Sequence, residues 1–178
     1  ALAGFVTAFL QTKLSVPSIL AGIITNIGLY SINLMVMGKS NQSLFMADTI
    51  YTMANEAGFA GSWYKLAVTA GIVIVVAVLL VLFLGTRLGL SIRATGDNAD
   101  MVRASSINPT FTITVGLCVA NALTGLSGAM VAQYSTFADV NSGTGMVVLA
   151  VAALVIGETL IGKSSMARGV VGVIAGSI

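Results

Sequence analysis

Three polar side chains share one face of an apolar segment near the start of the chain. Asn26, Tyr30 and Asn33 are four and three residues apart, a spacing that brings side chains to one face of a helix. Two amides and a phenol can hydrogen-bond a polar solute without the cost of burying a charge. The same groups can instead bond neighbouring helices and hold a bundle together. These two interpretations also apply to three further polar residues, Asn121, Gln133 and Tyr134.

Glu158 is an ionisable residue inside another apolar segment, and such a residue suggests a function. It stands five residues before Lys163, so one interpretation is a structural ion pair with Lys163 or Arg168. A contact with a coupling loop is the second interpretation. A proton relay is the third, but the sequence has no His and no second buried carboxylate to act as its partner.

Motifs of enzyme chemistry are absent from the sequence. It contains no phosphate-binding G-x-x-x-x-G-K-[ST], no HExxH and no G-x-S-x-G, the patterns that carry nucleotide, zinc and nucleophile chemistry. We therefore expect a chain that is not an enzyme and holds no metal or cofactor. Any ATP that drives it must be bound by a partner subunit. The net charge of +2 is too small to suggest a nucleic-acid partner.

The elements that position these residues are predicted to be membrane-spanning helices. The chain is 57% hydrophobic and 8% charged, whereas a soluble domain carries about 25% charged residues. Apolar runs near the length of about 20 residues that crosses a bilayer lie at about 18–37, 66–84, 110–132 and 146–162. The sequence thus predicts an all-α, polytopic bundle in the lipid bilayer, in which the six polar residues are candidates for a translocation pathway.

Both ends of the chain lie in apolar runs, at about 1–10 and 170–178. We expect these to be parts of two further spans of a single transmembrane domain, 1–178, cut at the boundaries of a fragment. Small residues let helix backbones approach closely. This role is expected for five glycines: Gly125, Gly128, Gly169, Gly172 and Gly176.

The polar loop 85–108 contains a predicted short helix. Asp97 is a good N-cap residue, and another Asp three residues later favours the positive end of the helix dipole. We expect the helix to run from Asn98 to about Ser106 and to end before Pro109, because proline disfavours helix in the preceding residue. Such a helix between two spans can take force from a soluble partner. An ordinary connector whose arginines only set the topology is the alternative.

Orientation follows from the basic residues, which favour the cytoplasmic side. If loop 85–108 is cytoplasmic, alternation of the spans places loops 11–17 and 163–169 on the same side. The basic residues on that side are then Lys13, Arg87, Arg93, Arg103, Lys163 and Arg168, against Lys39 and Lys65 outside.

The outer segments are less regular. A short helix is expected over 47–57, either along the interface or dipping into the bundle. Residues 133–145 are too polar for a lipid-facing span, and irregular backbone is tolerated at membrane depth only inside protein or beside water. A re-entrant turn or cavity cap is expected there. Trp63 and Tyr64 are expected at the outer interface.

The stretch RATGDNADMVRASSIN, residues 93–108, resembles the cytoplasmic coupling loop of the bacterial ABC importer permeases that serve branched-chain amino acids, ribose and related solutes. Those carry a pattern close to R-A-x-G-x-N-x-x-A-A-R-x-S-G-I-N. The matching residues are Arg93, Ala94, Gly96, Asn98, Arg103, Ser105, Ile107 and Asn108. Met101 and Val102 stand where the family has two alanines, and Ser106 stands where it has glycine. Segments 121–130 and 152–162 are also similar to the family, with Glu158 in place of a glycine.

The resemblance implies an amino-acid-handling branch of this permease family in the bacterial cytoplasmic membrane. It implies a second permease subunit, identical or different, together with ATPase subunits that bind the ATP and an extracytoplasmic solute-binding protein. The residues that would couple to the ATPase are Arg93, Ala94, Asp97, Asn98, Met101, Val102, Arg103 and Ile107. An ion-coupled secondary transporter or channel is the alternative, disfavoured because carboxylates within the spans are so sparse.

Overall fold

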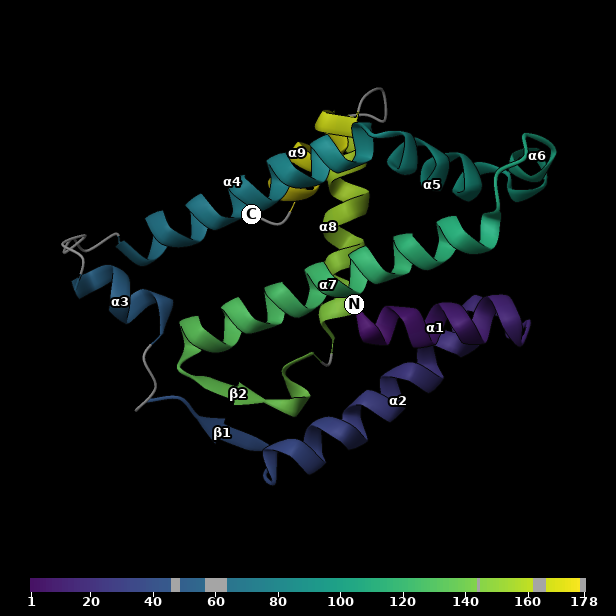
Figure 1. Ribbon diagram of the computed structural model, residues 1–178. Coiled ribbons are helices and arrows are strands. Elements are labelled where there is room, and N and C mark those ends of the chain that lie inside the picture. The colour runs from purple at the N-terminus through teal and green to yellow at the C-terminus, as the bar shows by residue number, and fades with distance from the viewer. Residues whose placement is uncertain (46–48, 57–63, 144, 162–165, 177–178) are drawn as a thin grey trace.

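The residues that the computed structural model describes form mainly α-helices, with two short strands and one turn of 3-10 helix (Figure 1). The structure describes residues 1–45, 49–56, 64–143, 145–161 and 166–176. The elements are α1 Leu2–Lys13, α2 Ser18–Met37, β1 Asn41–Ser43, α3 Ile50–Glu56, α4 Tyr64–Gly85, α5 Arg87–Asp97, α6 Ala99–Ala104, α7 Pro109–Ser135, β2 Phe137–Asp139, η1 Val140–Gly143, α8 Met146–Ile161 and α9 Met166–Gly176.

In the part of the chain that the structure describes, four stretches are long and apolar enough to cross a membrane: Ser18–Met37, Tyr64–Gly85, Pro109–Ser135 and Val140–Gly157. Their large apolar side chains face outward, with Val147 and Val148 in α8 more than two-thirds exposed. Water would penalise such a surface, whereas hydrocarbon is the solvent it fits. The prediction of an all-α, polytopic membrane fold is confirmed.

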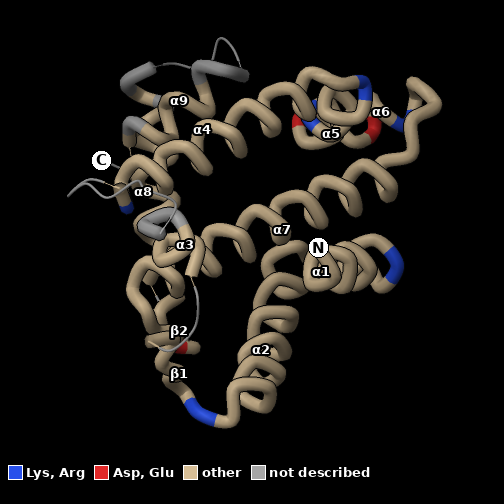
Figure 2. Tube along the Cα trace, turned by 60° about the vertical axis from the view of Figure 1, so that its left-hand side comes forward, with Lys and Arg blue, Asp and Glu red and all other residues tan. Residues whose placement is uncertain are grey.

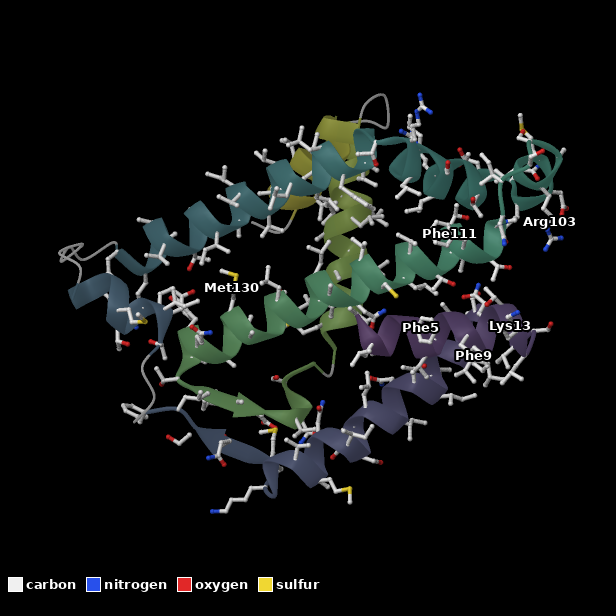
Figure 3. All side chains as sticks on the ribbon, viewed as in Figure 1. Phe5, Phe9, Lys13, Arg103, Phe111 and Met130 are labelled. Carbon is white, nitrogen blue, oxygen red and sulfur yellow. The ribbon has the colours of Figure 1, made fainter. Side chains whose placement is uncertain are left out.

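Helix α1 packs against both α2 and α7. A Cβ atom at Gly4 would collide with the backbone of Leu117 and Cys118 in α7, so the absence of a side chain sets how closely the two helices approach. On its other side, α1 donates a hydrogen bond from the Thr7 hydroxyl to the Thr25 hydroxyl of α2 at 2.9 Å. The side chains of Phe5 and Phe9 stay half-exposed on α1 (Figure 3).

Helices α8 and α9 meet through glycines. A Cβ atom at Gly172 would lie 2.9 Å from the Gly157 carbonyl oxygen, and one at Gly176 would collide with the Ala153 carbonyl. The expected close packing is therefore confirmed for Gly172 and Gly176. Gly125, Gly128 and Gly169 lie beside open space among the described residues.

A two-stranded antiparallel sheet joins segments that are far apart in sequence. Strand β1 pairs with β2 in the register Asn41 to Asp139 and Ser43 to Phe137. Part of the segment 133–145, expected to be irregular, is therefore regular: α7 continues to Ser135, and the strand and 3-10 turn follow. The short helix expected over 47–57 is α3, which begins at Ile50; residues 46–48 and 57 lie outside the described ones, as does Trp63.

Basic residues of three described helices lie toward one end of the molecule. Lys13 at the end of α1 lies toward the same end as Arg103 in α6 (Figure 3), and blue segments also lie on α5 and α6 in the rotated view (Figure 2). Lys39 follows α2, and Lys65 is in the first turn of α4, at helix ends that lie away from α6 (Figure 1). The helices thus separate two ends of unlike composition.

Candidate functional site

The loop 85–108 folds as two helices, α5 and α6, where the sequence predicted one. Thr86 caps α5, its hydroxyl oxygen accepting from the Gly89 N–H at 3.3 Å. Helix α5 is amphipathic, with Gly89 and Thr95 buried. A Cβ atom at Gly89 would collide with the backbone at the end of α4, which makes the bend between α4 and α5 tight. Helix α5 packs against α4, α6 and α7.

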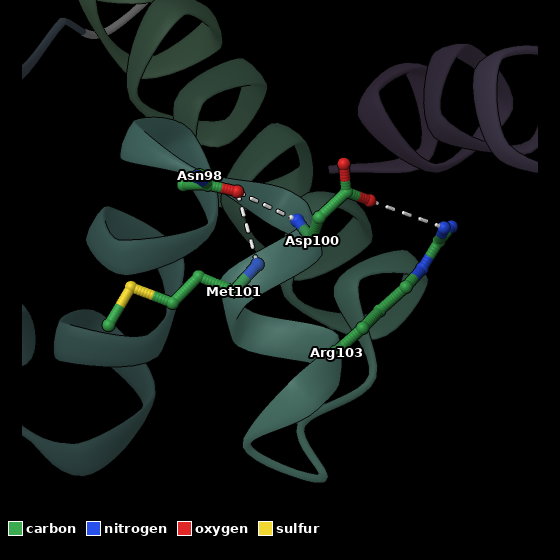
Figure 4. A network of polar contacts seen from close by, with 4 residues as sticks. All are labelled: Asn98, Asp100, Met101 and Arg103. Atoms are coloured by element: carbon green, nitrogen blue, oxygen red, sulfur yellow. Dashed lines mark hydrogen bonds and ion pairs between the residues drawn. The ribbon is translucent and has the colours of Figure 1, made fainter.

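The N-cap of α6 is Asn98, and the prediction of Asp97 as the cap is wrong. The Asn98 carboxamide oxygen accepts from the N–H of Asp100 at 3.0 Å and of Met101 at 3.1 Å (Figure 4). An N-cap residue needs an extended backbone, and Asn98 has it, with φ −158° and ψ 102°. Asp97 cannot serve because it is still the last residue of α5.

Helix α6 ends at Ala104, not at about Ser106, and proline is not what stops it. Ser106 has φ 61°, and its N–H donates to the Arg103 carbonyl at 3.1 Å. The N–H of Ile107 donates to the Val102 carbonyl at 3.2 Å. These two bonds form a Schellman motif, which places a left-handed residue just after the helix. Pro109 instead begins α7, with Asn108 as the cap that accepts from the Thr110 N–H at 3.0 Å.

The predicted coupling residues divide into an outward and an inward set. Met101 is 70% exposed, and the side chain of Arg103 is 68% exposed. Val102, by contrast, is 4% exposed and packs inside the loop, and its coupling role stays a prediction; Ile107 is half-buried. The remaining members are exposed: Arg93, Ala94, Asp97 and Asn98. We call α5 and α6 together the elbow, and we call Met101, Arg103 and these four residues its outer face.

An exposed ion pair joins Arg103 to Asp100, with the guanidinium nitrogen 3.8 Å from the carboxylate oxygen (Figure 4). The two residues are one helical turn apart on α6. Exposed pairs of this kind contribute about 0–1 kcal/mol to stability. The pair therefore orients the guanidinium at the surface more than it holds the helix together.

The stripe Asn26, Tyr30 and Asn33 is exposed along α2. The packed face of α2 is that of Ala21, which is fully buried, and of Thr25, bonded to α1. Among the described residues no side-chain hydrogen bond involves the stripe. Binding α2 to the described neighbouring helices is therefore not its use here, and the pathway role stays a prediction.

The other pathway candidates have partners in the chain. The Asn121 amide donates to the Leu117 carbonyl of its own helix at 3.0 Å. The Gln133 carboxamide oxygen accepts from the Ile50 N–H at 3.1 Å and so ties the end of α7 to the start of α3. Tyr134 belongs to the same junction and is described next. These contacts give Asn121 and Gln133 a structural role, and their part in a translocation pathway stays a prediction.

An aromatic junction connects α3, α4 and α7. The rings of Tyr51 and Tyr134 are edge-to-face with centroids 6.0 Å apart, and the Lys65 ammonium lies 5.7 Å from the Tyr134 ring centroid. The Tyr51 hydroxyl is 2.9 Å from the Thr69 hydroxyl. Beside them is an apolar pocket of about 330 Å³, lined by Tyr51, Leu66, Thr69, Met130, Val131 and Tyr134.

Sequence reasoning missed several of these residues. Tyr51 is nearly buried, yet a lone tyrosine in a polar segment carries no signal of its contacts. Thr95 and Thr112, which join α5 to α7, lie in segments where threonine reads as ordinary composition. The side chain of Glu158 and the residue Lys163 lie outside what the structure describes, so the three interpretations of Glu158 stand as they were.

Residues 1–178 match the family described as branched-chain amino acid transport system, permease component. The chain is 37% identical over 175 residues to a tyrosine transport system permease protein of Clostridioides difficile (strain R20291), covering 98% of this chain and 57% of the relative. It is 30% identical over 157 residues to an uncharacterised protein of Rickettsia prowazekii (strain Madrid E), covering 88% of this chain and 54% of that protein. No solved structure matches.

The match defines the class: a multi-pass membrane permease component of a transport system. This chain belongs to the branched-chain amino acid transport system permease family, and the family resemblance seen in the sequence is confirmed. The chain spans a little over half the length of the relatives it matches.

Proposed function

We propose that this chain is part of the membrane-spanning permease subunit of an ATP-driven importer for amino acids. The observation that carries the proposal is the elbow of α5 and α6, which presents Met101 and Arg103 outward from a helix capped at both ends. An apolar and a cationic side chain exposed on a short surface helix can bind a soluble partner, and movement of that partner would displace the helix. Family membership supports the same role.

The solute is proposed to be an amino acid, with tyrosine or a related one as the first to try. Support comes from the name of the Clostridioides difficile relative, a tyrosine transport system permease. A separate solute-binding protein outside the membrane would supply most of the selectivity for the solute. It would dock on the end of the chain that carries α3 and the β1–β2 pair. A second permease subunit would complete the pathway.

The elbow is proposed to face the cytoplasm of a bacterial cell, together with loops 11–17 and 163–169. Lys13, Arg87, Arg93 and Arg103 support this sidedness, since basic residues accumulate on the cytoplasmic side. Two ATPase subunits would bind ATP there, because this sequence has no phosphate-binding loop. Alternating access then needs contacts that differ between two states, and closure of the ATPases around α6 supplies them.

The test is affinity purification of the full-length protein from its native host in mild detergent, followed by mass spectrometry and an ATPase assay. Val102→Pro removes the N–H that donates to the Asn98 carbonyl at 3.3 Å and breaks α6. Ala99→Pro is the matched control, because Ala99 is the first residue of α6 and proline is favoured there.

The proposal expects an ATP-binding subunit to be recovered with wild type and Ala99→Pro and lost with Val102→Pro. The proposal would be overturned if no ATPase is recovered with the wild-type protein and an ion gradient alone drives its transport of an amino acid into vesicles. The chain would then be a component of an ion-coupled secondary transporter.

A further inference from the structure

A buried pair of hydroxyls fastens α5 to α7. The Thr95 and Thr112 hydroxyl oxygens lie 2.8 Å apart, and the two residues are 8% and 1% exposed. Near this point, a Cβ atom at Gly116 of α7 would lie 3.2 Å from Ile92 of α5, so the two helices are in close contact. The pair is thus a polar fastening within an otherwise apolar contact.

The pair has two protons for three hydrogen-bonding contacts. The Thr95 hydroxyl is also 2.7 Å from the Ser91 carbonyl, and the Thr112 hydroxyl is 2.9 Å from the Pro109 carbonyl. Each hydroxyl donates once, so one proton lies between the two oxygens and the other goes to one of the two carbonyls. Because a hydrogen bond is directional, this bond favours one position of α5 along α7, a constraint that an apolar pair of the same shape would not add.

The position of this fastening matters because α6 has two connections to the spans. One is the direct link Ser105–Asn108 into α7, which turns through the left-handed Ser106. The other runs back through Asn98 into α5, which packs on both α4 and α7. A push on α6 moves α5 and α7 as one body only if these two helices are locked together.

We propose that Thr95 and Thr112 are positioning residues for energy coupling: their hydroxyl bond makes α5 move together with α7 when α6 is displaced. The inference rests on the proposed function, since it presumes an ATPase that displaces α6. It assigns a role to Thr95, at an unspecified position of the coupling loop pattern, and to Thr112, which lies outside that pattern in a membrane-spanning helix.

The chain holds a matched control for this pair. Thr7 and Thr25 join α1 to α2 through hydroxyls 2.9 Å apart, with Thr7 8% exposed. Each of these hydroxyl oxygens also lies 2.9 Å from a carbonyl oxygen of its own helix, so this pair too has two protons for three contacts. This second pair has the same chemistry, although Thr25 is only half-buried, and it lies away from α5 and α6.

The experiment measures solute transported per ATP hydrolysed by the full transporter in proteoliposomes, with its binding protein and tyrosine as the solute. The variants are Thr95→Val with Thr112→Val, Thr7→Val with Thr25→Val, and the single changes Thr95→Val and Thr95→Ser. Valine keeps the shape and removes the hydroxyl, while serine keeps the hydroxyl. Melting temperature in detergent is recorded for each.

The Thr95/Thr112 double variant should transport about fivefold less per ATP, the factor that corresponds to one net hydrogen bond of about 1 kcal/mol. The Thr7/Thr25 variant should keep the wild-type ratio even if its melting temperature falls. If the double variant does not assemble, the single variants decide: Thr95→Val must lower the solute transported per ATP, and Thr95→Ser must keep the wild-type value.

An unchanged ratio in the Thr95/Thr112 variant, or an equal fall in both double variants, would overturn the positioning role and leave the proposed function intact. A wild-type protein whose transport needs no ATPase would overturn the proposed function, and this inference with it.

Discussion

The N–H of Ile107 donates to the carbonyl of Val102 at 3.2 Å across the end of α6. Val102 is buried and Ile107 half-buried, as expected for the apolar contact that accompanies a Schellman motif. Both residues belong to the coupling pattern, yet their geometry serves the shape of the elbow. The side chains left to meet a partner are those on its outer face, Met101 and Arg103 foremost.

Ser106→Gly should stabilise the elbow. Ser106 has φ 61°, a left-handed conformation that costs a residue with a Cβ atom about 1 kcal/mol relative to glycine. The melting temperature of the purified protein should rise. Ser105→Gly is the control: Ser105 has φ −86°, so glycine there gains nothing and adds freedom to the unfolded chain. A fall with Ser106→Gly would argue against the left-handed turn.

Asn98→Ala should loosen the start of α6, because it removes the acceptor for two backbone N–H groups. The loss of such a cap costs about 1 kcal/mol. Hydrogen exchange at Asp100 and Met101 should accelerate. Asp97→Ala should leave those amides unchanged, since Asp97 ends α5. If Asp97→Ala accelerated the exchange of these amides and Asn98→Ala left it unchanged, Asp97 would be the cap after all.

Gly172→Ala should destabilise the packing of α8 on α9. The added methyl would lie 2.9 Å from the Gly157 carbonyl oxygen, and overpacking of this kind costs about 1–3 kcal/mol. Gly169→Ala adds the same methyl to the same helix beside open space and should be tolerated. Thermal unfolding in detergent compares the two, and equal melting temperatures would contradict the contact.

The stripe on α2 should face water in the assembled transporter if it lines the pathway. In a protein with Cys118→Ser, Asn33→Cys should react with a charged, water-soluble thiol reagent, and solute should protect it. Ile24→Cys, on the opposite face of α2 and also exposed in this chain, should not react. Labelling of Ile24→Cys alone would place the pathway elsewhere.

Hydropathy located α2, α4, α7 and α8 because a bilayer imposes a length and a composition on each span. Local chemistry was less decisive at the elbow, where Asp97 and Asn98 are both good caps. Only the extent of α5 decides between them: Asp97 is still helical in α5, whereas Asn98 is extended. The pairing of Asn41 with Asp139 joins residues too far apart for local patterns to reveal. Ser106 carried a signal, since the resembling pattern has glycine there.

The most direct test of the docking surface is site-specific cross-linking in native membranes, with Cys118→Ser as the background. Met101 is exposed and the adjacent Val102 is buried. The single variants Met101→Cys and Val102→Cys are each treated with a thiol-specific photo-cross-linker. The account predicts that Met101→Cys captures an ATP-binding subunit and that Val102→Cys does not. Capture from Val102→Cys alone, or from neither position while transport still consumes ATP, would contradict α6 as the surface that meets the ATPase.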